Sequence, residues 1–131
     1  MDWKEVSGNS HLVWTTAMLE KFRKWIDWSE LSQTSHQCAL HPDNLERFKT
    51  YWDWYILSRN SSLELTHELL DRFADCWNWE EIIDRYEDNL YNSDFLHRYR
   101  DWIPASKLQN SRLWQELVEQ RKWQLAYEIT A

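Results

Sequence analysis

Apolar positions along the chain follow a helical period, and one short motif returns four times. It reads Leu19–Phe22, Leu45–Phe48, Leu70–Phe73 and Leu96–Tyr99, so its first leucines lie 26, 25 and 26 residues apart. Each copy belongs to a run in which apolar residues recur at three- and four-residue spacings, which is the pattern of an amphipathic helix. The sequence therefore predicts four such helices, each of about three turns.

Residues typical of helix N-caps stand in two columns of the repeat. The long helices are preceded by Thr15, His41, Thr66 and Asn92. The second column, directly before a Trp in each copy, is Asp2, Asp27, Asp53 and Asn78. Most of these side chains can accept a hydrogen bond from a first-turn N–H group. Each repeat is thus predicted to hold a short helix and a long one, joined by a turn at Asn9, Thr34 or Asn60, because Asn tolerates the left-handed conformation.

A two-helix unit of about 25 residues cannot bury its apolar stripe alone, so the copies are expected to stack. The sequence predicts one all-α domain over residues 1–131, either a short α-solenoid or a compact helical bundle. Its repeats span about 1–27, 28–53, 54–78 and 79–104, and a C-terminal capping helix is expected within 105–131, after a break at Pro104. The Trp column predicted at the joints between repeats, in the core, is Trp3, Trp28, Trp54 and Trp79.

The Asp-Trp-x-x-Leu-Ser-x-Asn signature, followed by Leu, Thr and Leu-Leu-x-x-Phe, resembles the tandem Trp-rich "WDW" repeats of uncharacterised bacterial and viral proteins. The resemblance is closest over residues 1–34 and 53–79 and is loose over 1–105. The fourth copy departs most, since Ile83 stands where the Ser is expected and Ala105 where the Trp is expected. The resemblance implies an interaction-type repeat and brings no activity with it.

Composition narrows the chemistry. The 131 residues include 11 Trp but a single Gly. A glycine-rich phosphate loop, a Rossmann fingerprint and a nucleophile elbow each need at least two glycines in fixed places, so all three are excluded. Hairpin-rich β architectures also depend on glycine in their turns. Without a complete catalytic constellation, we expect no enzymatic activity.

The charge balance bears on partners and on location. Fifteen basic against 22 acidic residues give a net charge of −7, which disfavours nucleic acid and anionic membrane surfaces and suits a basic protein partner. The chain has no run of about 18 apolar residues, and its first residues lack the order of a signal peptide. Two cysteines do not make a disulfide framework. We therefore expect a reduced cytoplasmic protein that binds neither membrane nor nucleic acid.

Three metal-capable side chains stand within six residues of the second repeat: His36, Cys38 and His41. Cys76 or His67 could complete a tetrahedral zinc site. Cys38, however, occupies the column of Leu12 and Leu63, which are expected to be buried, and His41 occupies the cap column. The segment His67–Asp71 is one residue short of the His-Glu-x-x-His pattern. We therefore expect no metal ion and no cofactor.

Two sets of charged residues are candidate partner-binding sites. The acidic set is Glu80, Glu81, Asp84, Glu87 and Asp88, of which Glu80, Asp84 and Glu87 would share one face of a helix. The basic row is Lys21, Arg47, Arg72 and Arg98, preceded in the first three repeats by Glu20, Glu46 and Asp71. The acid of one repeat can pair with the base of the next, or the guanidinium row can grip carboxylates or phosphates of a partner.

The leading hypothesis is a non-enzymatic protein-interaction module, an adaptor or a small acidic inhibitor that covers a basic surface of a larger partner, with the acidic face favoured as the contact. An alternative is a ligand-binding protein in which exposed Trp rings stack on nucleotides or sugars. An enzyme that uses the acidic patch is a third hypothesis.

Overall fold

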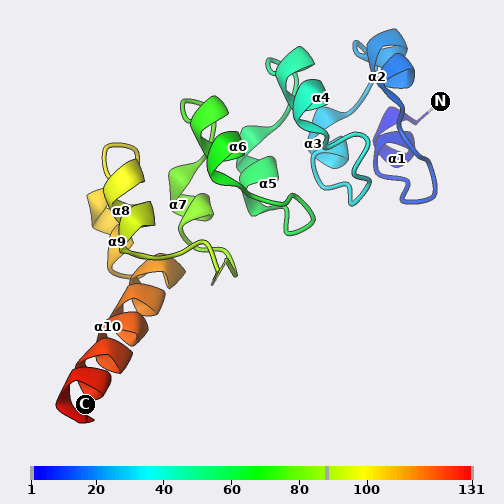
Figure 1. Cartoon of the computed structure of the whole chain (residues 1–131). Coiled ribbons are helices and arrows are strands. Elements are labelled where there is room, and N and C mark those ends of the chain that lie inside the picture. The colour runs from blue at the N-terminus through cyan, green and yellow to red at the C-terminus, as the bar shows by residue number, and fades with distance from the viewer. Residues whose placement is uncertain (1, 88, 131) are drawn as a thin grey trace. The chain divides into compact units, whose positions relative to one another are not determined.

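A computed structural model describes residues 2–87 and 89–130 (Figure 1). This part of the chain forms ten helices and no strand, so the predicted all-helical class is confirmed. The helices are α1 (Trp3–Ser7), α2 (Thr16–Phe22), α3 (Trp28–Leu31), α4 (Pro42–Arg47), α5 (Trp54–Arg59), α6 (His67–Arg72), α7 (Trp79–Ile82), α8 (Ser93–Tyr99), α9 (Ala105–Leu108) and α10 (Arg112–Thr130). None of these helices is both long enough and apolar enough to cross a membrane.

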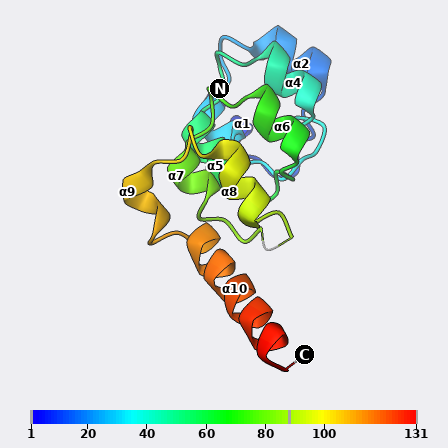
Figure 2. The ribbon, with the colours of Figure 1, turned by 60° about the vertical axis from the view of Figure 1, so that its left-hand side comes forward.

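The chain divides into two compact units, one up to Trp77 and the other from Asn78. The first unit contains α1 to α6, in which short helices alternate with the helices that carry the repeated motif. Figures 1 and 2 show α2, α4 and α6 side by side within this unit, with α1, α3 and α5 along its other side. The second unit contains α7 to α10.

The predicted N-cap residues begin their helices. In the motif-bearing helices, the side chains of Thr15, His41, Thr66 and Asn92 accept first-turn N–H groups. In the short helices, Asp2, Asp27, Asp53 and Asn78 do the same. Both cap columns are therefore confirmed.

The turn residues after the short helices do not adopt the left-handed conformation that the sequence suggested. No described residue has a positive φ, and Asn60 has φ −72° and ψ 107°. Their side chains instead form hydrogen bonds within the turns. Asn9 Oδ1 accepts the His11 N–H at 2.9 Å, and Asn60 Oδ1 accepts the Ser62 N–H at 2.9 Å. Asn60 Nδ2 also donates to the carbonyls of Ser32 and Thr34, both at 2.9 Å. Asn is thus explained here by side-chain hydrogen bonding.

The motif-bearing helices are shorter than the predicted three turns. Each has six or seven residues, which is about two turns. In the second repeat, the helix ends where Phe48 leaves helical geometry with φ −111° and ψ 29°. The chain then turns back so that the indole N–H of Trp52 donates to the Asn44 carbonyl at 3.1 Å. Packing of the buried Trp52 therefore takes the place of the predicted third turn of this helix.

The cores of both units consist of the apolar faces that the periodicity indicates. Buried side chains of the first unit include Leu19, Leu31, Leu45, Phe48, Leu57, Leu70 and Phe73. Those of the second unit include Ile82, Ile83, Tyr91, Phe95, Tyr99 and Leu113. The motif leucine is thus buried in the first three copies, whereas Leu96 of the fourth copy is half-buried.

The C-terminal helix begins at Arg112, within the predicted segment 105–131. Ser111 caps it, because its Oγ accepts the Trp114 N–H at 3.2 Å. The Leu113 N–H donates to the Ile83 carbonyl at 2.9 Å, so the first turn rests on the end of α7. Figure 1 shows the rest of α10 leading away from α7 to α9. Only its first part therefore serves as the expected cap.

The cap assignment predicts a modest loss of stability in Thr66→Ala. Thr66 Oγ1 accepts the Leu69 N–H at 3.1 Å at the start of a six-residue helix. Losing this bond should lower the free energy of unfolding by about 1 kcal/mol, measured by urea denaturation. Thr50→Ala is the matched control, since Thr50 is exposed and lies outside the helices. Equal stability of the two variants would show that the cap bond contributes nothing.

Candidate functional site

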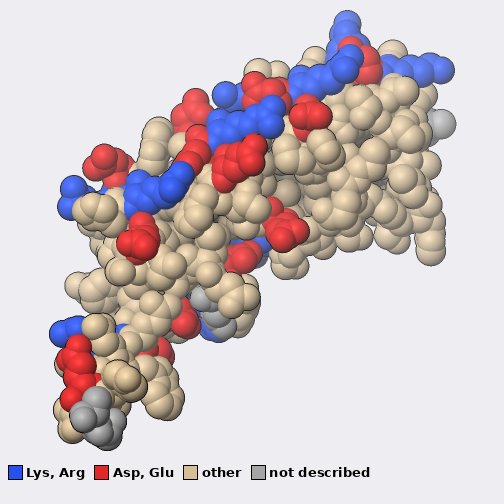
Figure 3. Space-filling view, viewed as in Figure 1, with Lys and Arg blue, Asp and Glu red and all other residues tan. Residues whose placement is uncertain are grey.

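The basic row of the first unit forms ion pairs with the acidic residues of the preceding repeat. Arg47 Nε lies 3.1 Å from Glu20 Oε2, and Arg72 Nε lies 3.7 Å from Glu46 Oε2. Figure 3 shows the Lys and Arg side chains gathered with Asp and Glu along the edge that α2, α4 and α6 form. In this unit, the interpretation that the acid of one repeat pairs with the base of the next is therefore confirmed.

Each cation of the row also lies over the aromatic ring that follows it in the motif. The distance from Arg47 Cζ to the Phe48 ring centroid is 5.9 Å, and that from Arg72 Cζ to the Phe73 centroid is 5.4 Å. Lys21 and, in the second unit, Arg98 lie over Phe22 and Tyr99 in the same way. The ion pairs are exposed, so each contributes at most about 1 kcal/mol. The row is a surface ladder whose charges remain accessible to a partner.

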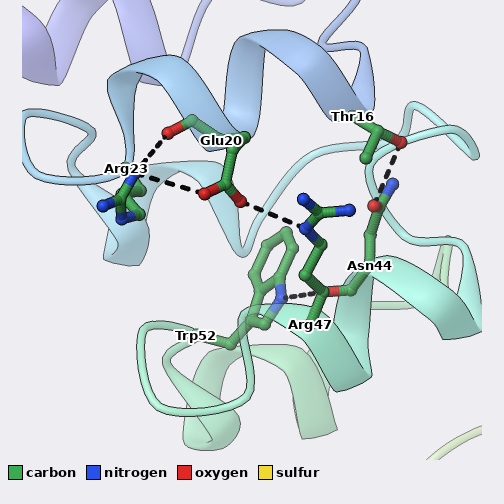
Figure 4. A network of polar contacts seen from close by, with 6 residues as sticks. All are labelled: Thr16, Glu20, Arg23, Asn44, Arg47 and Trp52. Atoms are coloured by element: carbon green, nitrogen blue, oxygen red, sulfur yellow. Dashed lines mark hydrogen bonds and ion pairs between the residues drawn. The ribbon is translucent and has the colours of Figure 1, made fainter.

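A polar network beneath the ladder joins α2 to α4 (Figure 4). The Thr16 hydroxyl donates to Asn44 Oδ1 at 3.1 Å, and Asn44 Nδ2 donates to the Cys38 carbonyl at 2.7 Å. Asn44 is buried, so these bonds satisfy an amide that would otherwise be costly to bury. Arg23 Nη1 meanwhile donates to the Glu20 carbonyl at 2.9 Å and holds the carboxylate that Arg47 contacts. The network fixes the spacing of neighbouring ladder steps.

The acidic set does not form the helical face that the sequence suggested. α7 ends at Ile82, so the residues that follow leave the helix axis. Glu80 Oε1 lies 3.6 Å from Lys107 Nζ, and Asp84 Oδ1 accepts the Arg112 backbone N–H at 3.1 Å. Glu81 is half-buried, and Asp88 lies outside the described residues. The expectation of one shared acidic face is therefore wrong, because these carboxylates bind different parts of the second unit.

Glu87 belongs to a largely buried cluster. Its Oε1 lies 3.0 Å from Arg85 Nη2, and the Arg85 side chain is only 7% exposed. The Tyr91 hydroxyl accepts the Arg85 backbone N–H at 3.0 Å and donates to the Ile82 carbonyl. Burial raises the pKa of Tyr91 above its ordinary value, so the phenol stays protonated. The sequence contains one signal for the burial of Tyr91. It stands directly before a helix cap, and the corresponding residue of the second repeat is the apolar Leu40.

The candidate metal ligands serve other roles. His36 Nε2 lies 2.5 Å from the Ser10 carbonyl, and His41 Nδ1 accepts the Asp43 N–H at 3.1 Å as a helix cap. Cys38 is exposed, contrary to expectation, because one more residue separates Thr34 from His41 than separates Asn60 from Thr66, and Ala39 enters the core instead. Leu12 is half-buried, so that column is not uniformly buried. Within residues 2–87 and 89–130, no three His, Cys, Asp or Glu side chains gather as a metal site.

The four Trp residues of the repeated column pack inside their own repeats. Trp28 lies 4.9 Å from Trp52, and Trp54 lies 5.0 Å from Trp77, with both ring pairs edge to face. Trp3 and Trp79 make their ring contacts with the first and fourth repeats. The bond toward the preceding repeat comes from the indole N–H, which Trp28 donates to the Arg23 carbonyl at 2.9 Å. The rings thus pack the first helix of a repeat against the end of its second helix, and the indole N–H of Trp28 adds a bond to the repeat before. Only Trp79 is buried as predicted, because Trp3, Trp28 and Trp54 are half-buried.

One aromatic position of the repeat is exposed in three copies, and the sequence pattern alone did not single it out. Trp25 is 57% exposed, Tyr51 38% and Trp102 47%. Trp25 stacks on Trp3 at 6.3 Å and 21°, and Trp102 stacks on Trp79 at 6.4 Å and 22°. Tyr51 lies 5.4 Å from Trp28 at 30°. We call Trp25, Tyr51 and Trp102 the aromatic positions.

The rings pack either stacked or edge to face, and the residue that follows the aromatic position in the sequence decides which geometry occurs. In the first and fourth repeats an isoleucine follows and is buried, and the Trp before it stacks outside. In the second and third repeats a Trp follows and takes the buried place edge to face, and the outer residue is Tyr51 or the half-buried Cys76. A Trp followed by Ile is exposed, whereas a Trp that comes second in the pair is buried. This order is the sequence signal that could have identified the exposed rings.

Two polar hollows lie at equivalent places in the loops of the first unit. One, of about 200 Å³, is lined by Ser7, Asn9, Glu30 and Thr34 among others. The other, of about 570 Å³, is lined by Gln33, Asp53, Tyr55, Arg59, Asn60 and Ser61 among others. Their linings are mainly hydroxyl and amide groups, with the Tyr55 ring at the larger one. Such linings suit neutral polar ligands such as sugars.

Comparison with protein-family models, with curated proteins and with solved structures finds no match to this chain. The likeness to Trp-rich repeats therefore stays a prediction.

Proposed function

We propose that this protein is a non-enzymatic protein-binding module whose aromatic positions anchor a basic surface of its partner. The observation that carries the proposal is the pair of exposed indoles, Trp25 and Trp102, each already stacked on another Trp. Trp and Tyr are enriched among the residues that dominate binding free energy at protein interfaces. Rings held in place before binding also lose less conformational freedom when a partner docks.

The chemistry of these rings favours a cationic partner. The face of an indole attracts the guanidinium of Arg or the ammonium of Lys. The net charge of −7 draws a basic surface toward the protein before contact. The charged residues Glu80, Glu81, Asp84, Lys21, Arg47, Arg72 and Arg98 belong to this proposal as rim residues that orient the partner. The exposed ladder at Arg47 and Arg72 supports that role.

The repeat architecture predicted from the sequence is part of this proposal. We propose that the repeats stack as a short α-solenoid of the Trp-rich type, because such arrays present extended surfaces to other proteins. A protein of this kind acts as an adaptor or as an inhibitor that occludes its partner. Both cysteines are free thiols, which supports a reducing compartment such as the cytoplasm as the place of action.

Affinity capture with the intact chain tests this function. Trp25→Ala and Trp102→Ala should each reduce recovery of one defined basic protein by about tenfold, because each removes an anchoring ring. Trp123→Ala is the control, since Trp123 is an exposed Trp outside the repeated position. Recovery should also fall as salt rises. Equal recovery by all the variants, at equal thermal stability, would show that the aromatic positions do not bind the partner.

The larger hollow favours a second candidate function, the binding of a sugar or nucleotide. Tyr55 offers a ring for stacking, and Gln33, Asn60 and Ser61 offer polar groups beside it. Adding a panel of oligosaccharides and nucleotides should then change the Trp fluorescence of the protein, and Tyr55→Ala should abolish the change. An unchanged spectrum over the whole panel would count against ligand binding.

A further inference from the structure

The distal part of α10, residues 118–129, is an exposed apolar segment of the second unit. Its apolar side chains are between 37% and 83% exposed: Val118, Trp123, Leu125, Tyr127 and Ile129. The helix is held to the rest of the second unit by the buried Leu113 and, as far along as Gln120, by a bond that its Nε2 donates to the Tyr91 carbonyl at 2.7 Å. Helices of this length gain most of their stability in water from packing. The distal part is therefore a surface that stands to gain from being covered.

The exposed side chains lie on two sides of the helix. At about 100° per residue, Val118, Leu125 and Ile129 fall within about 40° of one another and form one stripe, which we call the leucine face. Trp123 and Tyr127 lie on the opposite side. Arg121 and Glu128 are seven residues apart, so both flank the leucine face along the same edge. This edge carries one charge of each sign.

The charges of the segment favour a second copy of the chain as the occupant. Residues 118–129 contain two acidic and two basic side chains, whereas the whole chain carries −7. Two copies repel one another through their acidic surfaces, and the neutral segment is where they approach with the least repulsion. In an antiparallel pair of helices, the same edge of each helix faces that of the other. A two-fold axis between residues 124 and 125 then places Arg121 opposite Glu128 of the second copy, twice.

We propose that the leucine face of α10 pairs antiparallel with the leucine face of a second copy. Leu125 meets its counterpart near the axis, and Ile129 packs near Val118 of the other chain. The contact is about 18 Å long, for twelve residues that rise about 1.5 Å each. An interface of this size belongs to the small, weak class, so the dimer forms reversibly at micromolar concentrations. This surface is separate from the aromatic positions that would bind another protein.

Sedimentation equilibrium of the full chain, over about 5 to 200 micromolar, measures the proposed dimer. The average mass should rise toward that of two chains, and Leu125→Glu should weaken the dimer by about tenfold or more because it places a charge at the axis. Trp123→Gln is the control on the opposite side and should leave the dimer unchanged. Circular dichroism verifies that each variant is equally helical. A wild-type chain that stays monomeric throughout would overturn the proposal and leave the leucine face to another protein.

A charge exchange tests the antiparallel arrangement. Arg121→Glu alone and Glu128→Arg alone should each weaken the dimer, because each puts like charges opposite one another. An equimolar mixture of the two variants should recover dimerisation, since the acidic edge of one chain then meets the basic edge of the other. A dimer unaffected by Leu125→Glu, or single variants whose mixture associates no better than either alone, would overturn the arrangement.

Discussion

Replacing the half-buried Trp54 by alanine is expected to lower the free energy of unfolding by about 3 kcal/mol, the lower end of the range for truncation of large packed side chains. The Trp54 ring lies 5.1 Å from Phe73 and 5.0 Å from Trp77, so it joins α5 to the segment that follows α6. Its indole N–H donates to the Lys49 carbonyl at 2.9 Å, in the repeat before. Truncation therefore removes ring packing within one repeat and a hydrogen bond to another. Urea denaturation followed by far-ultraviolet circular dichroism measures the loss.

Two variants separate these contributions. Trp54→Phe keeps much of the ring packing and loses the N–H donor, so its stability should fall between that of wild type and Trp54→Ala. Trp25→Ala removes an exposed ring that stacks on Trp3 and should lower the free energy of unfolding by less than about 1 kcal/mol. If Trp54→Ala and Trp25→Ala were equally stable, the repeated Trp column would be a surface feature that contributes little to packing within the repeats.

The features predicted correctly from the sequence are those that depend on near neighbours in the chain. An N-cap such as Thr66 bonds to a residue only three positions away, so composition and spacing are enough to identify it. The apolar face around Leu70 is likewise visible in the 3.6-residue period. Repetition strengthened both signals, because the same residue type returned at the same position of each copy.

The ends of the long helices were predicted wrongly because packing decides them. Nothing local prevents another helical turn after Phe48. The turn is lost because Trp52 is buried and donates its N–H to the Asn44 carbonyl, eight residues earlier. Burial of a large ring gains more free energy than one further turn of an isolated helix. The hydrophobic period shows where apolar residues stand. It does not show whether a ring such as Trp52 gains more from burial than the helix gains from another turn.

The net charge of the sequence does not reveal which cations pair with the acidic residues. The excess negative charge was visible, but the cations that meet it lie about one repeat away. Lys107 pairs with Glu80, 27 positions earlier, just as Arg47 pairs with Glu20, 27 positions earlier. The repeat register already contained this spacing. The spacing of the Glu20–Arg47 pair was therefore the sequence signal that pointed to Lys107 as the partner of Glu80.

The aromatic positions could not be identified from the apolar character of their residues alone. Trp25 and Ile26 are adjacent and both apolar, yet Ile26 is buried and the ring of Trp25 is exposed. Which of two neighbours points inward depends on where the chain leaves the preceding helix, and that exit was the feature mispredicted. The error in helix length and the missed surface rings therefore have one physical cause.

The second large effect is expected for Tyr91→Phe. The Tyr91 hydroxyl, in the core of the second unit, accepts the Arg85 N–H and donates to the Ile82 carbonyl. Phenylalanine keeps the ring and removes both bonds. Each buried polar group left without its partner costs about 1–3 kcal/mol, so the free energy of unfolding should fall by about 2–4 kcal/mol at pH 8. Tyr86→Phe is the matched control, because Tyr86 is highly exposed and its substitution should change stability little.

The size of this effect should depend on pH. Burial raises the pKa of Tyr91 above the ordinary value of about 10, so the folded chain keeps the phenol proton where the unfolded chain releases it. The stabilisation is therefore complete below pH 10 and decreases as the pH rises above it, by up to about 1.4 kcal/mol per pH unit. Tyr91→Phe lacks this titration and otherwise carries the same ionisable groups as the wild type. The difference in free energy of unfolding between wild type and Tyr91→Phe should consequently narrow between pH 8 and pH 11. A difference that stays constant over this range would show that the phenol ionises equally in the folded and unfolded chains, and that the buried cluster with Arg85 is not formed.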